Sequence, residues 1–294
     1  MGKFVITSDS SCDLLDTTVN ALDVKCAFLS YTIGDEMFYD DMVAEHKDEF
    51  YDKMYKGAVP KTSQVTPAQF IDFFTPILDE GKPILHLSIA STLSGTLTSA
   101  NIAVAELMGE SENADIRVVD TGVGSAGIAM LIYEAVKYRD AGKTIEETIA
   151  HIDAIKGHIN VLITTNDLTY MRRGGRISTA SAVIGSALSI NPIIALSKDS
   201  RLFVQGKVRG EKAVKAKFMD MLESSVLKPE KQTLYVAHSR APERAKEYAE
   251  EIQKRFGFKS VEFMQFGTII GTHAGPGLVS AWYFGKGRKS AVIK

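Results

Sequence analysis

The stretch Pro83-Ile-Leu-His-Leu-Ser-Ile-Ala90, followed by Ser91-Thr-Leu-Ser-Gly-Thr96, carries the pattern that decides the fold. A short apolar run that ends in a polar, glycine-containing turn predicts a buried strand and a loop. Residues 97–108 then predict a helix, and a second strand is expected over residues 115–121. Strands that alternate with helices are typical of a parallel sheet whose ligand loops follow the carboxyl ends of the strands.

The same alternation extends outward from this stretch. Residues 4–8 predict a strand that ends in a polar cluster, and Thr66-Pro-Ala-Gln69 predicts a capped helix start. A long helix to Ala141 and another from Thr144, capped through Glu147, follow the second strand. We therefore expect residues 1–157 to form an α/β domain, with a parallel sheet and helices on both faces. Residues 40–56 are charged with scattered aromatics and predict a solvent-facing helix or an insertion.

The pattern changes after residue 157. Strands are expected at 160–165, 192–196, 202–208, 233–237 and 261–265, with helices at 211–227 and 242–256. Residues 158–294 should therefore form an α+β domain. A chain of 294 residues exceeds what one core usually organises, and a cleft between two domains is a natural ligand site. We expect the ligand in that cleft.

Composition limits the classes of function. Hydrophobic residues make up 45% and charged residues 24% of the chain, as in ordinary globular proteins. A net charge of −2 offers no basic surface for nucleic acid, so none is expected as a partner. Two cysteines and an N-terminus without a signal-like apolar region predict reduced thiols in the cytoplasm. The six histidines show no metal-ligand spacing, and no metal is expected.

One glycine-rich pattern in the chain resembles a nucleotide-binding motif. Gly122-Val-Gly-Ser-Ala-Gly127 matches the dinucleotide fingerprint, but a ribose-binding acid is missing at a second strand end. Close helix packing is the favoured interpretation, with nucleotide binding left as the alternative. The chain has no Gly-x-Ser-x-Gly elbow, so a conventional hydrolase is disfavoured and no catalytic residue is assigned.

Three polar loops could hold an anion. They are Lys61-Thr62-Ser63-Gln64, Ser94-Gly95-Thr96 before a helix, and the glycine-spaced loop 271–277, in which His273 is the only long titratable side chain. Taken singly, Thr62 and Ser94 also fit turn or cap positions, and His273 also fits a hydrogen-bonded core histidine. Hydroxyls and an imidazole that converge would suit a carboxylate or phosphate held by neutral donors.

Five motifs in order resemble the DegV family: Thr7-Ser-Asp-Ser10, Lys61-Thr-Ser-Gln64, Leu93-Ser-Gly-Thr96, Arg173-Gly-Gly-Arg-Ile177 and Gly271-Thr-His-Ala-Gly-Pro-Gly277. The resemblance implies the fatty-acid-binding component of bacterial fatty acid kinase, whose partner subunit supplies ATP. It implies that Thr62, Ser94 and His273 bind the fatty-acid carboxylate. The resemblance further implies that the loops supporting this site contain Ser63, Gly95, Thr96, Thr272, Asp9 and Ser10. It also implies that the kinase subunit contacts Arg209 and Arg173.

The resemblance therefore implies a lipid carrier that is not itself an enzyme. A long-chain fatty acid would be its ligand, no cofactor is expected, and the product would be an acyl phosphate for phospholipid synthesis. Residues 180–190 resemble the region that admits the acyl chain, although core packing also fits. The alternatives are a free-standing enzyme with His273 as base or nucleophile, and a pure interaction module. Acyl length, oligomeric state and transient contact with a membrane surface stay open.

Overall fold

The computed structural model describes residues 4–111, 113–177 and 190–291, and the chain divides into two compact units. Unit 1 comprises Met1–His46 and Pro60–Lys156, whereas unit 2 comprises Lys47–Val59 and Gly157–Lys294. The domains expected from the sequence were 1–157 and 158–294. Their boundary lies within one residue of the point, after Lys156, where the chain passes from unit 1 to unit 2. The expected first domain includes the segment 47–59, which the structure groups with unit 2. The expected cleft between the domains stays a prediction.

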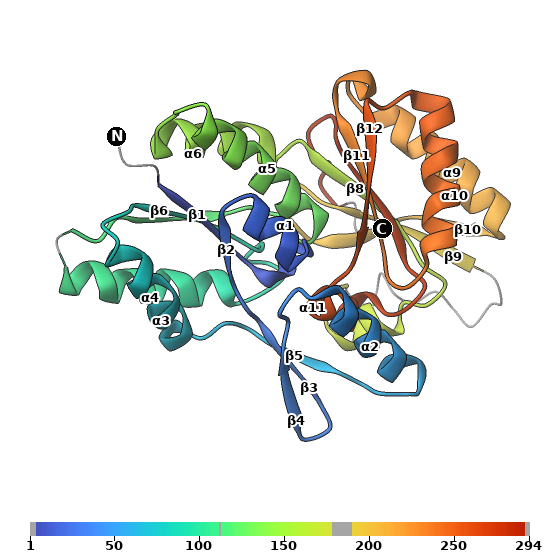
Figure 1. Cartoon of the computed structure of the whole chain (residues 1–294). Coiled ribbons are helices and arrows are strands. Elements are labelled where there is room, and N and C mark those ends of the chain that lie inside the picture. The colour runs from blue at the N-terminus through green and yellow to red at the C-terminus, as the bar shows by residue number, and fades with distance from the viewer. Residues whose placement is uncertain (1–3, 112, 178–189, 292–294) are drawn as a thin grey trace. The chain divides into compact units, whose positions relative to one another are not determined.

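Unit 1 is built on a parallel four-stranded sheet in the order β2-β1-β6-β7 (Figure 1). The strands are β2 (Val24–Ala27), β1 (Val5–Asp9), β6 (Ile84–Ser88) and β7 (Ile116–Asp120). Every neighbouring pair in it is parallel. All five residues of β6 are buried, as expected for a strand inside a parallel sheet covered on both faces. The predicted parallel sheet is confirmed.

Helices cover both faces of this sheet, as the sequence predicts. Figure 1 shows α3 (Pro67–Leu78) and α4 (Thr96–Glu110) on one face, with α5 (Ala126–Asp140) and α6 (Ile145–Lys156) on the other. Both capping boxes are present: Thr66 caps α3 with Gln69, and Thr144 caps α6 with Glu147. The short helices η1 (Ser10–Cys12) and α1 (Asp16–Ala21) follow β1.

A small antiparallel sheet in unit 1 was not expected from the sequence. It consists of β4 (Glu36–Tyr39), β3 (Ser30–Ile33) and β5 (Lys61–Ser63), in that order. Strands of three or four residues give too short a run for an alternating pattern to stand out. This sheet matters for the site because the register pairs Tyr31 with Thr62 and thereby fixes the position of Thr62.

Unit 2 contains a mixed sheet in the order β10-β9-β8-β13-β11-β12. Its strands are β8 (Ile159–Thr164), β9 (Ile190–Leu196), β10 (Leu202–Arg209), β11 (Thr233–His238), β12 (Ser260–Gln265) and β13 (Val279–Phe284). Among the described strands of this sheet, only β11 and β12 pair in parallel. β13 was not predicted, although it lies at the centre of the sheet.

Helices α9 (Glu211–Ser225) and α10 (Pro242–Phe256) pack against this sheet and enclose the core of unit 2. Phe218 of α9 meets Tyr248 of α10 edge to face, with ring centroids 5.1 Å apart. A short 3₁₀ turn, η2 (Pro229–Lys231), leads into β11. The predicted α+β character of the C-terminal half is therefore confirmed.

A second helical group in unit 2 joins α2 (Ala44–Tyr55), α7 (Thr169–Arg173) and α11 (Thr268–Ala274). The helix or insertion expected over residues 40–56 forms as helix α2, which is exposed along one face but buries Lys47, Phe50, Tyr51 and Met54 along the other. The Tyr51 hydroxyl donates to the Phe266 carbonyl at 3.1 Å. No helix within the described ranges combines the length and apolarity needed to cross a bilayer.

Candidate functional site

Two of the predicted polar loops meet in unit 1. Thr62 lies half-buried in the middle of β5, with Ser63 exposed beside it. Gln64 follows directly, and its Nε2 donates to Ser99 Oγ of α4 at 2.8 Å. The Gln64 side chain also packs on Gly95 so closely that a methyl group at that position would collide with it. The loop of Thr62 and the turn of Gly95 are therefore neighbours.

Ser94 and Thr96 form a hydroxyl pair at the start of α4. Ser94 Oγ lies 2.9 Å from Thr96 Oγ1 and accepts the Thr96 backbone N–H at 3.2 Å. Ser94 is half-buried and Thr96 fully buried, while the N-cap residue Gly95 supplies no side chain. Free N–H groups and the helix dipole favour negative charge at such a helix start. Ser94 thus caps its own turn and also stands where an anion is favoured.

Asp9 and Ser10 brace the neighbouring strand ends. The fully buried Asp9 carboxylate accepts the Ile89 N–H at 2.9 Å, the Ser11 N–H at 3.2 Å and the Ser11 hydroxyl. Burial raises the pKa of Asp9, and these hydrogen bonds oppose the rise. Ser10 Oγ accepts the Leu29 N–H at 3.1 Å. These bonds join the end of β1 to the segments after β6 and β2.

The segment 271–277 corrects one expectation. It was expected to be a glycine-spaced loop, but residues 271–274 belong to helix α11, and the turn begins at Gly275 with a φ of 72°. Glycines are needed here because side chains approach closely: Tyr51 lies against Gly271, and the Tyr170 ring lies against Gly275. The glycines therefore bring two aromatic rings against the helix that carries His273.

His273 is half-buried and neutral at pH 7. The motif glycine Gly174 lies against its imidazole, and a methyl group at Gly174 would come within 2.9 Å of His273 Cε1. Burial, and secondly the nearby Arg176 cation, lower the pKa of His273 to about 4. Arg176 is itself half-buried and donates to the Gly174 carbonyl. A neutral imidazole beside a guanidinium is well suited to an incoming carboxylate.

Arg176 was not among the predicted site residues. It belongs to the basic cluster 172–176, whose arginines could either cap carbonyls or meet a partner. The structure shows the first role, and it adds an electrostatic effect on His273. Its place in the Arg-Gly-Gly-Arg motif was the only signal in the sequence, because spacing alone could not place it near residue 273.

The remaining predicted residues lie apart from these contacts or serve the helix itself. Thr272 is buried, and its hydroxyl donates back to the Thr268 carbonyl at 2.8 Å. Arg173 is exposed, with its guanidinium 5.7 Å from the Tyr170 ring centroid. Arg209 is exposed at the end of β10. The segment 180–190, expected to admit the acyl chain, lies outside the described residues except for the backbone of Ile190.

The chain itself fills the anion position of the dinucleotide-like motif. Gly122-Val-Gly-Ser-Ala-Gly127 opens α5, but the Ser125 N–H donates to the Ser11 carbonyl at 2.8 Å. The Ser125 hydroxyl donates to the Asp13 carboxylate. A phosphate would have to displace both partners, which supports the interpretation of this motif as helix packing.

Metal binding finds no ligand cluster in the described part of the chain. Within it, no three histidine, cysteine, aspartate or glutamate side chains gather as metal ligands would. Cys12 is buried, Cys26 is half-buried, and both are free. The donors that remain are hydroxyls, backbone N–H groups, an imidazole and a guanidinium.

Fold and donors together define a two-unit α/β protein whose polar loops are suited to an anionic group. The family model described as "Uncharacterised protein, DegV family" matches residues 3–286. The chain belongs to the DegV family, which confirms the resemblance carried by its five motifs.

The similarity to known proteins extends over nearly the whole chain. A DegV domain-containing protein of Clostridium perfringens is 34% identical over 286 residues, which cover 97% of this chain and 98% of the relative. A fatty acid binding DegV family protein of Streptococcus agalactiae has a TM-score of 0.82 at 27% identity, covering 96% and 98% of the two chains. The Fatty Acid Kinase (Fak) B3 protein of Streptococcus pneumoniae, loaded with linoleic acid, has a TM-score of 0.82. The match is 21% identical and covers 96% of this chain and 99% of the Streptococcus pneumoniae protein, so the two proteins share the fold.

Proposed function

We propose that this protein binds a long-chain fatty acid and presents its carboxylate to a separate ATP-dependent kinase subunit. The observation that carries the proposal is the nearly full-length likeness to the fatty acid binding relative of Streptococcus agalactiae. The donor set supports it, because hydroxyls at a helix start and a neutral imidazole suit a carboxylate. No cofactor is part of this proposal.

The head group would be held by named donors. Thr62 and Ser94 would donate hydroxyl hydrogen bonds to the carboxylate oxygens, with the start of α4 adding favourable potential. His273 of unit 2 would donate from its neutral imidazole, and Arg176 would add positive charge nearby. Hydrogen bonds to a charged group contribute about 1.5–3 kcal/mol each, so the head group sets orientation and reactivity.

The acyl chain would supply most of the affinity. Burial of a methylene stabilises by about 0.8 kcal/mol, so roughly fourteen methylenes contribute about 11 kcal/mol before ordering costs. Loss of one head-group hydrogen bond should therefore leave binding largely intact. This difference lets an experiment separate binding of the fatty acid from presentation of its carboxylate.

The phosphoryl step needs a second subunit. A carboxylate oxygen would attack the γ-phosphorus of ATP held by that subunit, ADP would leave, and an acyl phosphate would form. The described chain supports this division of labour, because the helix start most like a nucleotide site is filled by Ser11 and Asp13. The exposed Arg173 and Arg209 would meet the kinase, and the two proteins would work in the cytoplasm, with transient contact at a membrane surface for lipid exchange.

A free-standing enzyme with His273 as base is the second candidate. A histidine whose pKa lies near 4 is a weak base at neutral pH, since efficient base catalysis favours a pKa close to the working pH. The neighbouring Arg176 cation lowers basicity further rather than supporting it. The carrier function is therefore the better supported of the two.

The first test is native purification from a bacterial host, organic extraction and mass spectrometry of the released lipid. A stoichiometric long-chain fatty acid is expected. A protein that carries none, and that takes up none when fatty acid is added, would refute the carrier function.

The second test assigns the head-group roles. Thr62→Ala and Ser94→Ala should keep the bound fatty acid yet lower acyl-phosphate formation at least tenfold when ATP and the kinase subunit are supplied. Thr98→Ala, an exposed hydroxyl on α4, is the matched control and should match wild type. Wild-type turnover in both site variants would disprove the assigned roles while leaving fatty-acid binding untouched.

A further inference from the structure

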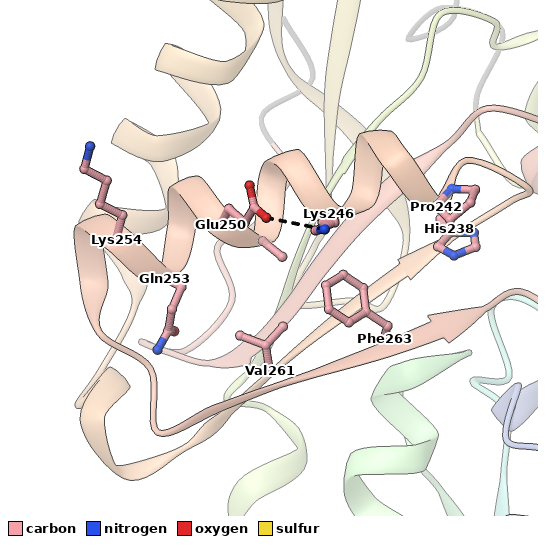
Figure 2. A pocket seen from close by; sticks show the side chains of 9 residues that line it. His238, Pro242, Lys246, Glu250, Gln253, Lys254, Val261 and Phe263 are labelled. Atoms are coloured by element: carbon pink, nitrogen blue, oxygen red, sulfur yellow. Dashed lines mark ion pairs between the residues drawn. The ribbon is translucent and has the colours of Figure 1, made fainter.

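A hollow of about 690 Å³ lies between α10 and β12 in unit 2 (Figure 2). Pro242, Lys246 and Ala249 of α10 contribute to one wall, and Val261 and Phe263 of β12 to the other. Phe263 is 52% exposed, so its ring stands open to solvent at the side of the hollow. None of these residues belongs to the proposed carboxylate site.

β12 forms one edge of the six-stranded sheet of described residues. The Phe266 N–H, just beyond β12, donates to the β11 carbonyl of His238 at 2.9 Å. Since alternate residues of a strand turn their backbone groups to the same neighbour, Met264 and Glu262 also face β11. Val261 and Phe263 must then present their N–H and C=O groups to the open edge. Val261 and Phe263 therefore line the hollow with their side chains and also present backbone N–H and C=O groups that a further strand could bond.

We propose that β12 and α10 form a binding groove for an extended peptide segment of a partner protein, which adds to the sheet as a further strand. Alternate side chains of that segment would enter the hollow beside Phe263 and Ala249. Peptides that bind by strand addition gain affinity from main-chain hydrogen bonds and specificity from pockets for alternate side chains. A strand the length of β12 spans about 20 Å, which matches the roughly 22 Å of α10.

A peptide fits this groove better than an acyl chain does. An acyl chain could fill the hollow, but it has no amides to bond the outward groups of Val261 and Phe263. Unpaired edge groups of this kind are templates for another strand. This argument is independent of the proposed fatty-acid function, because it uses only contacts within unit 2.

The rim charges indicate which peptide is favoured. Lys254 lines the hollow and pairs with no carboxylate in the described ranges. Lys246 reaches Glu250 only at 3.9 Å, with 72% and 68% of the two side chains exposed. Such an exposed pair contributes little. An apolar segment that carries an acidic residue is therefore the expected occupant.

The test begins with a phage-displayed library of random 12-residue peptides, panned on the full chain. The enriched peptides are synthesised, and their Kd values are measured by fluorescence anisotropy against three variants. Phe263→Ala removes the apolar contact, and Val261→Pro keeps an apolar side chain but removes an outward N–H. Met108→Ala, which truncates a 49% exposed apolar side chain on α4, is the matched control. Thermal unfolding checks the fold of each variant, and Phe263→Ala decides the matter if Val261→Pro unfolds.

At least tenfold weaker binding is expected for both β12 variants, and unchanged binding for Met108→Ala. Amide hydrogen exchange in residues 260–265 should slow when the peptide is added. Peptides that bind both β12 variants as tightly as wild type, or a panning experiment without enrichment, would overturn the proposal. If oleate slows exchange in β12 and displaces the peptide, the hollow is an acyl site instead, and the proposal fails in that way.

Discussion

Acid should destabilise unit 1 through one buried histidine. His86 of β6 is fully buried, its Nδ1 lies 3.0 Å from Thr7 Oγ1, and its ring meets Phe70 and Phe74 edge to face. Its Nε2 has no hydrogen-bond partner among the described residues. Burial lowers the pKa of His86 to about 3, whereas the unfolded chain keeps the ordinary value near 6.5.

The sign of the effect follows from proton uptake. Between pH 3 and pH 6.5 the unfolded state binds a proton that the folded state does not, so the free energy of unfolding falls as pH falls. From pH 7 to pH 5, this one site should cost about 2 kcal/mol of stability. That loss is a large share of the stability of an ordinary domain.

A double replacement isolates the contribution of His86 to the loss of stability between pH 7 and pH 5. Thr7→Val with His86→Leu replaces both hydrogen-bond partners by apolar groups, so stability at pH 7 should stay within about 1 kcal/mol of wild type. The double variant should also lack the 2 kcal/mol loss at pH 5. Thr7→Val alone keeps the histidine and is the matched control. His86→Leu alone strands the buried Thr7 hydroxyl and should be about 1–3 kcal/mol less stable than the double variant at both pH values.

Urea unfolding at pH 7 and pH 5, followed by far-UV circular dichroism, measures these differences. Hydrogen exchange of residues 84–88 reports on unit 1 separately, because two units need not unfold together. Equal losses from pH 7 to pH 5 in wild type and the double variant would refute the reasoning, and the buried imidazole would then have to be protonated within the fold.

Two further predictions concern the site loops. Arg176→Gln should raise the pKa of His273 above its wild-type value of about 4, because a nearby cation is removed; NMR titration of the imidazole measures this, and an unchanged pKa would exclude the electrostatic role of Arg176. Gly95→Ala should destabilise by about 0.5–1.5 kcal/mol because the new methyl group displaces the exposed end of Gln64 and breaks its hydrogen bond to Ser99, and the same change should cost nothing further in a chain that already carries Gln64→Ala. Thermal unfolding of the single and double variants tests this, since strictly additive effects would contradict the proposed contact.

The sequence predicts the elements whose signals are local. The run 83–90 is apolar apart from His86 and Ser88, so its strand is recognisable. Thr66 with Gln69 marks the start of α3 through bonds that the structure contains. β13 was missed because its buried residues, Val279-Ser-Ala-Trp-Tyr-Phe284, do not alternate between apolar and polar. A central strand with both faces covered gives no period of two.

Glycine misled the prediction at α11. Gly271 and Gly275 read as loop residues, since glycine weakens helices by about 1 kcal/mol relative to alanine. In the structure Gly271 lies inside a helical turn, where its missing side chain leaves room for Tyr51. Packing against a distant aromatic ring overrides local propensity here, and no window around residue 271 contains that ring.

The candidate site was predictable only in part. Resemblance pointed to Thr62 and Ser94, but the contact that joins their loops is made by Gln64 on Gly95, and local patterns cannot show it. The depressed pKa of His273 likewise depends on burial and on Arg176, which comes from another helix-turn segment. The side chains that can donate hydrogen bonds could be named from the sequence. Their contacts, burial and pKa shifts could be found only from the three-dimensional structure.

The excursion of residues 47–59 into unit 2 has a consequence for synthesis on the ribosome. The partners of the apolar face of α2, Phe266 and Gly271, are made at least 215 residues after Tyr51. Translation proceeds at about 5–20 residues per second, so the Phe266 carbonyl that Tyr51 bonds is made roughly 10–40 s after Tyr51 itself. Unit 1 can complete its sheet within that interval, but α2 cannot bury Phe50 and Tyr51. The nascent chain therefore carries the apolar face of this otherwise charged helix unburied until Phe266 and Gly271 have been made.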